Sequence, residues 1–160
     1  MKTLQLNTIF LAILTAGCFN QREIAKQQIS DPVFPKGEKI TSNNFVGQAW
    51  LQVLMAADSL NPASVGSVTF EPGARTNWHL HPGGQILLVL DGVGYYQEKG
   101  SPKRILHKGD AVKCPPDKEH WHGASKDQPF VQVAITNTKE GPTVWLQKVS
   151  DEEYHSGDSD

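Results

Sequence analysis

The sequence predicts an all-β fold, and three observations support that prediction. Fourteen glycines and ten prolines divide the 160 residues into many short pieces, and this frequency of turn residues suits an all-β protein better than a helical bundle. About ten short strand-like runs recur at regular spacing from Phe45 onward, the pattern of a β-sandwich or barrel. No long amphipathic helix competes with them. With 38% hydrophobic residues, the chain has enough apolar material for one domain with one core.

Residues 1–17 have the composition of a signal peptide. One lysine precedes an apolar stretch at residues 9–14, which is too short for a permanent transmembrane helix, and small residues lead up to Cys18. Small residues followed by cysteine resemble a bacterial lipoprotein signal, although Thr15 stands where a branched aliphatic residue is more usual. We therefore expect an exported protein at the cell envelope or periplasm, anchored to a membrane by lipid on Cys18. A plain secreted form and an unprocessed cytosolic chain are the alternatives.

Residues 18–43 are expected to form a polar tether between the lipidated Cys18 and the folded domain, because they are polar and then rich in proline and glycine. With Cys18 lipidated, Cys114 is the only thiol of the mature chain, which excludes an intramolecular disulfide. Nothing around Cys114 marks a catalytic cysteine, so we interpret it as a small buried apolar residue.

The barrel is expected to span residues 44–150, with turn signals between its strands. The strongest of these signals is Asp91-Gly92, which predicts a hairpin turn. The expected runs are 45–55, 63–74, 75–81, 85–92, 93–100, 101–110, 111–117, 119–125, 129–137 and 143–150. Residues 151–160 are expected to form a short C-terminal turn and an acidic tail, with Ser150 and Glu153 at the spacing of a capping box.

Two His-x-His pairs and one glutamine are the candidates for a metal site. Alternate side chains of a strand share a face, so Arg75 is expected to point the same way as His79 and His81. Two imidazoles on one face can share a metal ion. Gln85 follows after a Pro-Gly-Gly turn and can present a third ligand.

The second pair, His120 and His122, follows a proline-rich turn and lies on one face of another expected strand. His120 is the fourth expected ligand, beside His79, His81 and Gln85. Three neutral imidazoles and an oxygen donor suit Mn, Fe, Co, Ni or Zn.

The spacing of these residues resembles the first sequence motif of the cupin family. That motif is glycine, five residues, His-x-His, three residues, glutamate, six residues and glycine. Its positions here are Gly73, His79, His81, Gln85 and Gly92, with every spacing kept and only the acid changed.

The second cupin motif is glycine, five residues, Pro-x-Gly, two residues and histidine. Its positions here are Gly109, Pro115, Asp117 in place of glycine, and His120. The resemblance covers about residues 45–150. It implies an antiparallel β-barrel of jelly-roll type, also called a double-stranded β-helix, with the metal inside.

The stretches "SVTFEPGARTNWHLHPGGQ" and "VWLQKVSDEEY" are most similar to bacterial manganese cupins that cleave or form cyanohydrins. These are the (R)-selective, mandelonitrile lyase-like hydroxynitrile lyases, which share the glutamine ligand. The resemblance implies manganese as the metal, with Fe, Ni, Co or Zn as alternatives. Gln132 departs from the lyase-like members, which tend to carry a histidine at that position. Glutamine can form hydrogen bonds but cannot act as a base.

The amide of Gln85 favours Lewis-acid chemistry. A carboxylate ligand would cancel one unit of the metal's charge and an amide cancels none, so anions and carbonyl oxygens should bind the ion better. His122 is the expected general base, because a neutral imidazole titrates near working pH. Arg75 and Gln132 complete the expected catalytic set and would orient a polar substrate.

We therefore predict a metal-dependent enzyme that acts on a small carbonyl-type molecule by hydroxynitrile-lyase-like cleavage or formation of a C–C bond. A cupin dioxygenase or decarboxylase, quercetinase-like or carboxymuconolactone-decarboxylase-like, is the first alternative. A non-enzymatic metal- or small-molecule-binding cupin at the cell envelope is the second. Lys+Arg 15 against Asp+Glu 17, with no basic stripe, makes nucleic acid a poor candidate partner. A homodimer or tetramer that covers barrel edges is expected.

Overall fold

The structure, a computed structural model, describes residues 31–157. The expected signal peptide, Cys18 and the first part of the expected tether lie outside the described residues. Within residues 31–157, no helix combines the length and the apolar character that crossing a membrane requires.

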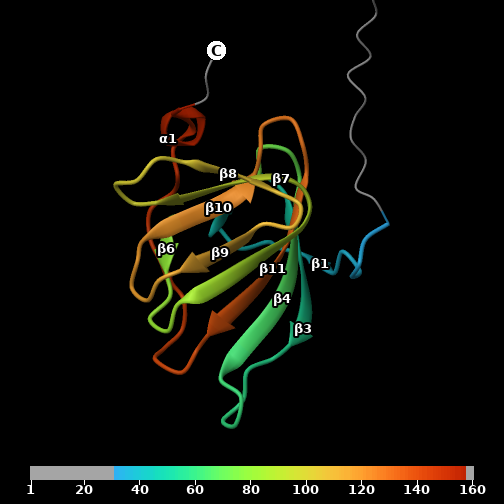
Figure 1. Cartoon of the computed structure of the whole chain (residues 1–160), viewed down its shortest axis with the longest axis vertical. Helices are drawn as coiled ribbons and strands as arrows, with labels where there is room; N and C mark the ends of the chain where they lie inside the picture. The colour runs from blue at the N-terminus through green and yellow to red at the C-terminus, as the bar shows by residue number, and fades with distance from the viewer. Residues whose placement is uncertain (1–30, 158–160) are drawn as a thin grey trace, which may run out of the picture.

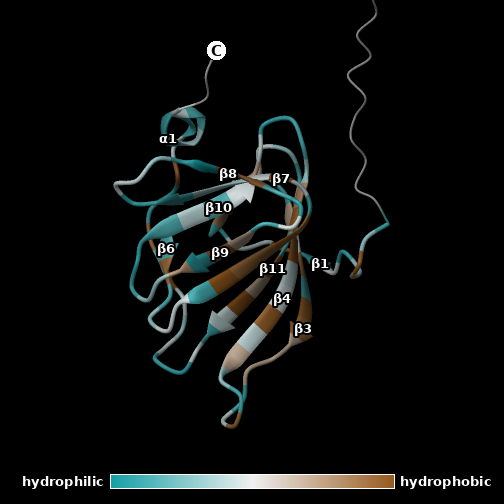
Figure 2. Ribbon diagram, viewed as in Figure 1, coloured by the Kyte–Doolittle hydropathy of each residue, from teal (hydrophilic) through white to brown (hydrophobic). Residues whose placement is uncertain are grey.

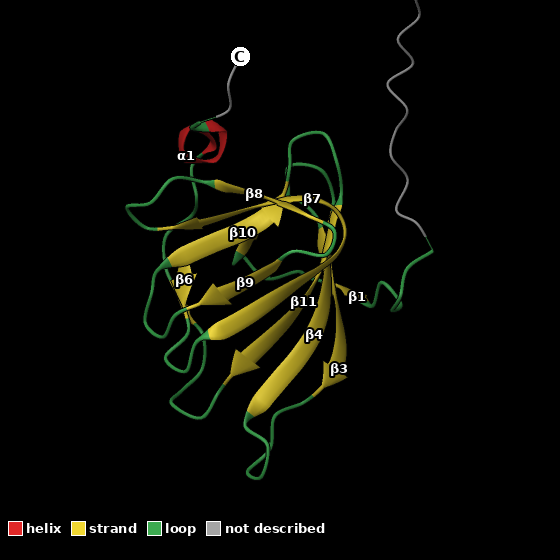
Figure 3. Cartoon of the chain, in the orientation of Figure 1, coloured by secondary structure: helices red, strands yellow, loops and turns green. Residues whose placement is uncertain are grey.

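Twelve strands form one curled sheet in which neighbouring strands are antiparallel (Figures 1 and 3). The strands are β1 (Glu38–Lys39), β2 (Phe45–Val46), β3 (Ala49–Met55), β4 (Ala63–Phe70), β5 (Arg75–Thr76), β6 (His79–Leu80), β7 (Gln85–Glu98), β8 (Arg104–His107), β9 (Ala111–Cys114), β10 (His120–Ala124), β11 (Phe130–Asn137) and β12 (Val144–Trp145). A short helix, α1 (Asp151–His155), follows them. The predicted all-β fold is confirmed. Because β1 pairs with β3, the described sheet begins inside the segment expected to be a tether.

The longest strand, β7, belongs to both halves of the sheet. Its first half lies between β11 and β9, and its second half lies between β10 and β8. The hairpin turn expected at Asp91-Gly92 is wrong, because β7 continues through both residues. Leu90 is an extra residue in the register with β11, and Gly92 has a φ of +77°, which glycine adopts without steric cost. The strand therefore bends at this point without reversing, and the bend carries it from one half of the barrel to the other.

The strand expected at residues 75–81 is interrupted, which changes the side chains that face inward. β5 ends at Thr76 and β6 begins only at His79, so two residues break the alternation. Thr76 lines the same cavity as His79, whereas Arg75 contacts the C-terminal segment. The expectation that Arg75 shares a face with His79 is therefore wrong.

The larger hydrophobic core fills part of the barrel interior. Hydropathy colouring shows hydrophobic residues along β3 and β4 (Figure 2), but on β3 only Ala49 belongs to this core, since Leu51, Val53 and Met55 are exposed. The core consists of Ala49, Val68, Phe70, Ala74, Leu87, Val89, Tyr96, Leu106, Val112, Cys114, Ala124 and Phe130. Burial raises the pKa of the Cys114 thiol to about 12, so the thiol is protonated and packs as an apolar group, as predicted.

A second cluster packs the C-terminal segment against the outside of the sheet. It consists of Trp78, Tyr95, Trp121, Val149 and Tyr154. The predicted capping box is confirmed at the start of α1: the backbone N–H of Glu153 donates to Ser150 Oγ, and the backbone N–H of Ser150 donates to the Glu153 carboxylate. This capped helix holds the buried ring of Tyr154 over the sheet.

Candidate metal centre

Four histidines from two short segments meet inside the barrel. β6 pairs with β10 so that His79 and His120 lie directly opposite each other, and their ring centroids are 4.3 Å apart. His81 directly follows β6, with its ring centroid 5.4 Å from that of His120. The ring centroid of His122, on β10, is 5.2 Å from that of His79. All four side chains are buried.

Three of these histidines, His79, His81 and His122, line a cavity of about 120 Å³ in the barrel interior. Strands on either side supply the aromatic, aliphatic and hydroxyl groups of its wall. The lining residues are Phe45, Val68, Phe70, Thr76, His79, His81, Gln85, His122, Ala134, Thr136, Thr143 and Trp145. No carboxylate is among these lining residues of the described chain, so a cation here would meet only neutral groups.

Two of the imidazoles are oriented by their own backbone. Nδ1 of His79 lies 2.9 Å from the carbonyl oxygen of Asn77, and Nδ1 of His120 lies 2.8 Å from that of Lys118. Both partners are the carbonyl two residues earlier. Because a carbonyl can only accept, Nδ1 carries the proton and Nε2 keeps a free lone pair. The same local geometry thus recurs on both strands and prepares each Nε2 to bind a ligand.

The other two imidazoles are held by side chains. Thr143 Oγ1 lies 3.1 Å from Nδ1 of His81, and Gln132 Nε2 lies 3.0 Å from Nδ1 of His122. Gln132 is fully buried on β11, and its contact with the cluster is made through His122. The structure therefore brings Gln132 to the site behind His122 and does not place it among the residues that line the cavity.

Burial keeps the histidine cluster neutral. Burial lowers the pKa of His79 and His122 well below 6.5, and the neighbouring imidazoles lower it further. Burial, with a smaller contribution from His120, lowers the pKa of His81 to about 4. The pKa of His120 is also lowered by burial, although the hydrogen bond to Lys118 opposes this shift. A neutral imidazole is the form that binds a metal ion.

Buried atoms without a protein partner show that a metal ion fits this site. Nε2 of His81, Nε2 of His120 and Oε1 of Gln85 are buried and have no hydrogen-bond partner. A buried polar atom left unpaired costs about 1–3 kcal/mol, and coordination to a cation would offset that cost. The three atoms belong to the residue types that divalent transition metals accept.

Geometry also defines a three-histidine group that could hold a divalent metal. The candidate ligand atoms of His79, His120 and His122 all lie within 4.8 Å of one another. The set predicted from the sequence and this group share His79 and His120. They differ in a third histidine, which is His81 in the predicted set and His122 in the geometric group.

Arg75 lies outside this cavity, contrary to the prediction. Its guanidinium donates to the Val149 carbonyl at 3.0 Å and to the Asp151 carboxylate at 2.6 Å, and it lies 4.5 Å from the ring centroid of Tyr154. Arg75 therefore ties the C-terminal segment to β5. Its contacts give no support to the expected role in orienting a substrate.

The sequence prediction missed the hydroxyl and aromatic residues of the cavity wall. Thr136 Oγ1 accepts a hydrogen bond from Gln85 Nε2 at 2.8 Å, and it could have been found because it shares a strand face with Gln132. The ring centroid of Trp145 lies 4.8 Å from that of His79 and 5.7 Å from that of Phe45. Trp145 is brought there by the pairing of β12 with β6, which no local pattern in the sequence indicates.

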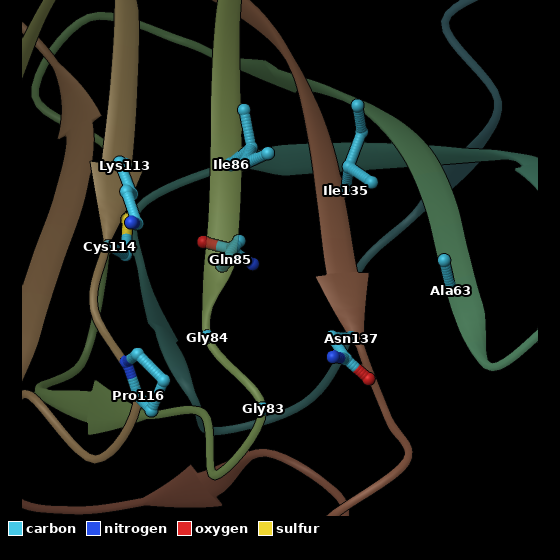
Figure 4. A pocket seen from close by; sticks show the side chains of 10 residues that line it. All are labelled: Ala63, Gly83, Gly84, Gln85, Ile86, Lys113, Cys114, Pro116, Ile135 and Asn137. Carbon is cyan, nitrogen blue, oxygen red and sulfur yellow. The ribbon is translucent and has the colours of Figure 1, made fainter.

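A larger hollow of about 330 Å³ lies on the outer face of β7, β9 and β11 (Figure 4). Ile86, Lys113 and Ile135 line it, and Gln85 borders both this hollow and the inner cavity. None of the four clustered histidines is among its lining residues. We place the candidate site in the smaller cavity, because three of those histidines line it.

Comparison with known proteins agrees with this arrangement. The family model described as the cupin domain matches residues 66–136. An (R)-mandelonitrile lyase from Granulicella tundricola is 40% identical over 111 residues, which cover 69% of this chain and 85% of that protein. The chain belongs to the cupin family.

Solved structures of other proteins support the same assignment for this cupin. A cupin-like protein from Thermotoga maritima is 48% identical with a TM-score of 0.75, over 78% of this chain and 96% of that chain. A cupin 2 conserved barrel domain protein from Rhodopseudomonas palustris is 16% identical with a TM-score of 0.58, over 72% of this chain and 78% of that one. The latter likeness concerns the fold alone. The predicted cupin barrel is thus confirmed.

Proposed function

We propose that this cupin is a metal-dependent lyase that cleaves and forms cyanohydrins of small carbonyl compounds. The observation that carries the proposal is the uncharged ligand set, in which buried Nε2 atoms of His81 and His120 and the amide oxygen of Gln85 lack protein partners. The 40% identical relative is an (R)-mandelonitrile lyase, which is consistent with this chemistry. His79, His81, Gln85 and His120 would hold the metal, with Mn²⁺ as our first choice.

The neutrality of the ligands decides the type of chemistry that we propose. When bound, a divalent ion would supply Lewis acidity to a carbonyl or hydroxyl oxygen and attraction for an anion such as cyanide. A glutamate at position 85 would weaken both effects by cancelling one charge. Gln85 therefore favours polarisation of a carbonyl over activation of dioxygen.

His122 is the residue to which we assign the proton transfer. In cleavage, Nε2 of His122 takes the hydroxyl proton of the cyanohydrin, the C=O bond forms, and the C–C electron pair leaves with cyanide. Cyanide then takes up the proton to give hydrogen cyanide, so His122 returns to its starting state. Burial keeps the His122 ring neutral at pH 7, so its free lone pair can accept a proton, although the same lowering of the pKa makes the ring a weaker base than a free imidazole.

Gln132 would select the tautomer that this step requires. Either end of its amide can face Nδ1 of His122, since the two ends have the same shape. In the structure Gln132 Nε2 faces Nδ1 of His122, so this step requires the reversed amide, in which Oε1 accepts the Nδ1 proton and the buried NH₂ group takes the place of the unpaired oxygen. Nε2 of His122 then carries the free lone pair.

The aromatic wall would exclude water and contact the organic part of the substrate. Phe45, Phe70 and Trp145 line the cavity, and Trp145 is 36% exposed, so solvent reaches part of this wall. A cavity of about 120 Å³ limits the substrate to a small molecule.

The test is anaerobic turnover of mandelonitrile by protein loaded separately with Mn²⁺, Fe²⁺ and Zn²⁺. We expect release of benzaldehyde without oxygen consumption, and loss of activity in His122→Asn but not in His107→Asn, a change at an exposed histidine on β8. The Gln85→Glu variant should be slower, and unchanged or higher activity would contradict the charge argument. Oxygen consumption with a diketone or flavonol would instead support a dioxygenase, and absence of bound metal would exclude both enzymatic functions.

A further inference from the structure

We propose that Thr136 is a positioning residue that fixes which end of the Gln85 amide faces the histidines. The inference rests on the proposed metal site, because it concerns a ligand of that site. The two ends of the Gln85 amide differ chemically, and only the oxygen can bind a cation. Thr136 is the residue that would keep the nitrogen away from the histidines.

Strand register places the two residues together. Gln85 begins β7, and its direct partners in the ladder are Thr136 on β11 and Cys114 on β9. Directly opposed residues of an antiparallel pair have Cβ atoms about 5 Å apart on the same face. Gln85 therefore has a hydroxyl on one side and a thiol on the other. The thiol is protonated and a weak acceptor, so Thr136 is the better partner for an amide N–H.

The hydrogen bond in the structure leaves the amide oxygen free, because the Thr136 hydroxyl, which can donate or accept, accepts here. Gln85 Nε2 donates to Thr136 Oγ1 at 2.8 Å, while Oε1 is buried without a partner. Figure 4 shows the same arrangement: the nitrogen of Gln85 lies toward β11 and the oxygen lies toward the opposite side. If the amide were reversed, its NH₂ group would face the histidines, with no lone pair for a cation and with partial positive charge toward it.

The four predicted ligands differ in how their orientation is secured. His79 and His120 bond backbone carbonyls, which substitution of a side chain does not remove. His81 and Gln85 depend on the hydroxyls of Thr143 and Thr136. Thr143 is therefore a matched control, since it also supplies one hydroxyl to one ligand of the same cavity but does not contact the amide.

The experiment measures Mn²⁺ and Co²⁺ affinity by titration calorimetry, together with the visible spectrum of bound Co²⁺. Thr136→Val should weaken metal binding by about 10- to 100-fold, the usual effect of removing a group that orients a ligand, and should change the Co²⁺ spectrum. Thr136→Ser, which keeps the hydroxyl, should restore both. Thr136→Ala tests the same loss with a smaller side chain if the valine variant does not fold.

The decisive comparison repeats Thr136→Val in the Gln85→Glu background. Both ends of a carboxylate are oxygen, so its orientation does not matter. In the Gln85→Glu background, loss of the Thr136 hydroxyl should therefore weaken metal binding by no more than about twofold, which is within the scatter of independent changes. Thr143→Val, in contrast, should weaken binding equally in both backgrounds.

Equal losses from Thr136→Val in both backgrounds, or failure of Thr136→Ser to restore affinity, would overturn the proposal. These readouts do not depend on turnover. A wild-type protein that binds Mn²⁺ or Co²⁺ but does not cleave cyanohydrins would contradict the proposed function alone, whereas a wild-type protein that binds neither ion would overturn both.

Discussion

Metal-free protein should lose stability steeply as the pH falls from 7 to 5. Burial depresses the histidine pKa values in the folded chain below the ordinary 6.5, for His81 to about 4. Stability is therefore complete above pH 6.5, and it falls below that pH because the unfolded chain binds protons that the folded chain does not. The loss is about 1.4 kcal/mol per pH unit for each such histidine, or about 2 kcal/mol between pH 6.5 and 5. The pKa values of His79, His120 and His122 shift in the same direction, so each of them adds to the loss, and the loss of about 2 kcal/mol from one histidine already compares with a typical total stability of about 5–15 kcal/mol.

The assay is urea unfolding in the presence of chelator at pH 7 and pH 5, followed by circular dichroism. His81→Gln should reduce the difference between the two pH values by about 2 kcal/mol, and His107→Gln, at an exposed position on β8, should leave it unchanged. A difference of under about 2 kcal/mol for the wild-type protein, the value for one histidine, would refute the conclusion that four imidazoles are buried and neutral.

Three further predictions concern the metal, the backbone and the C-terminal helix. Saturation with Mn²⁺ at about 100 times its dissociation constant should add about 2.7 kcal/mol and raise Tm by about 10 °C, and chelator should reverse this shift in a thermal scan. Gly92→Ala should destabilise the fold by more than about 2 kcal/mol, because its Cβ would overlap the Pro129 carbonyl. Gly100→Ala has a similar φ but nothing within 4 Å, so it should cost only about 1 kcal/mol in urea unfolding. Tyr154→Phe removes the hydrogen bond to the Ala124 carbonyl and should cost about 1 kcal/mol without changing metal affinity.

The sequence was sufficient to predict the fold and the meeting of the two His-x-His pairs. Alternation and turn residues predict strands, and the two motif spacings resemble those of one family. The hairpin expected at Asp91-Gly92 was wrong because the same dipeptide signal serves a bend as well as a reversal. The difference depends on β11, whose register with β7 takes up the extra residue Leu90, and that partner is nearly forty residues away in the chain.

The error at Arg75 has a similar cause. Parity counting assumes one continuous strand, but the chain between Thr76 and His79 is not in the ladder. Counting alternate residues back from His79 therefore assigns Arg75 to the inner face, whereas Thr76 is the residue that lines the cavity. Trp145 was missed for a related reason, since only the pairing of β12 with β6 brings it beside His79.

One arrangement explains both the metal site and the predicted acid sensitivity. Burial keeps the imidazoles neutral, which makes them ready to bind a cation, and it also makes their protonation in the metal-free folded state unfavourable. A substitution that removes one of the buried imidazoles should therefore change both the metal affinity and the stability at low pH. His81→Leu would replace a buried imidazole that has an unpaired nitrogen with an apolar group, so the metal-free protein should become more stable at pH 5 while metal affinity falls. If stability at pH 5 and metal affinity changed independently across variants of the four histidines, the two properties would need separate explanations.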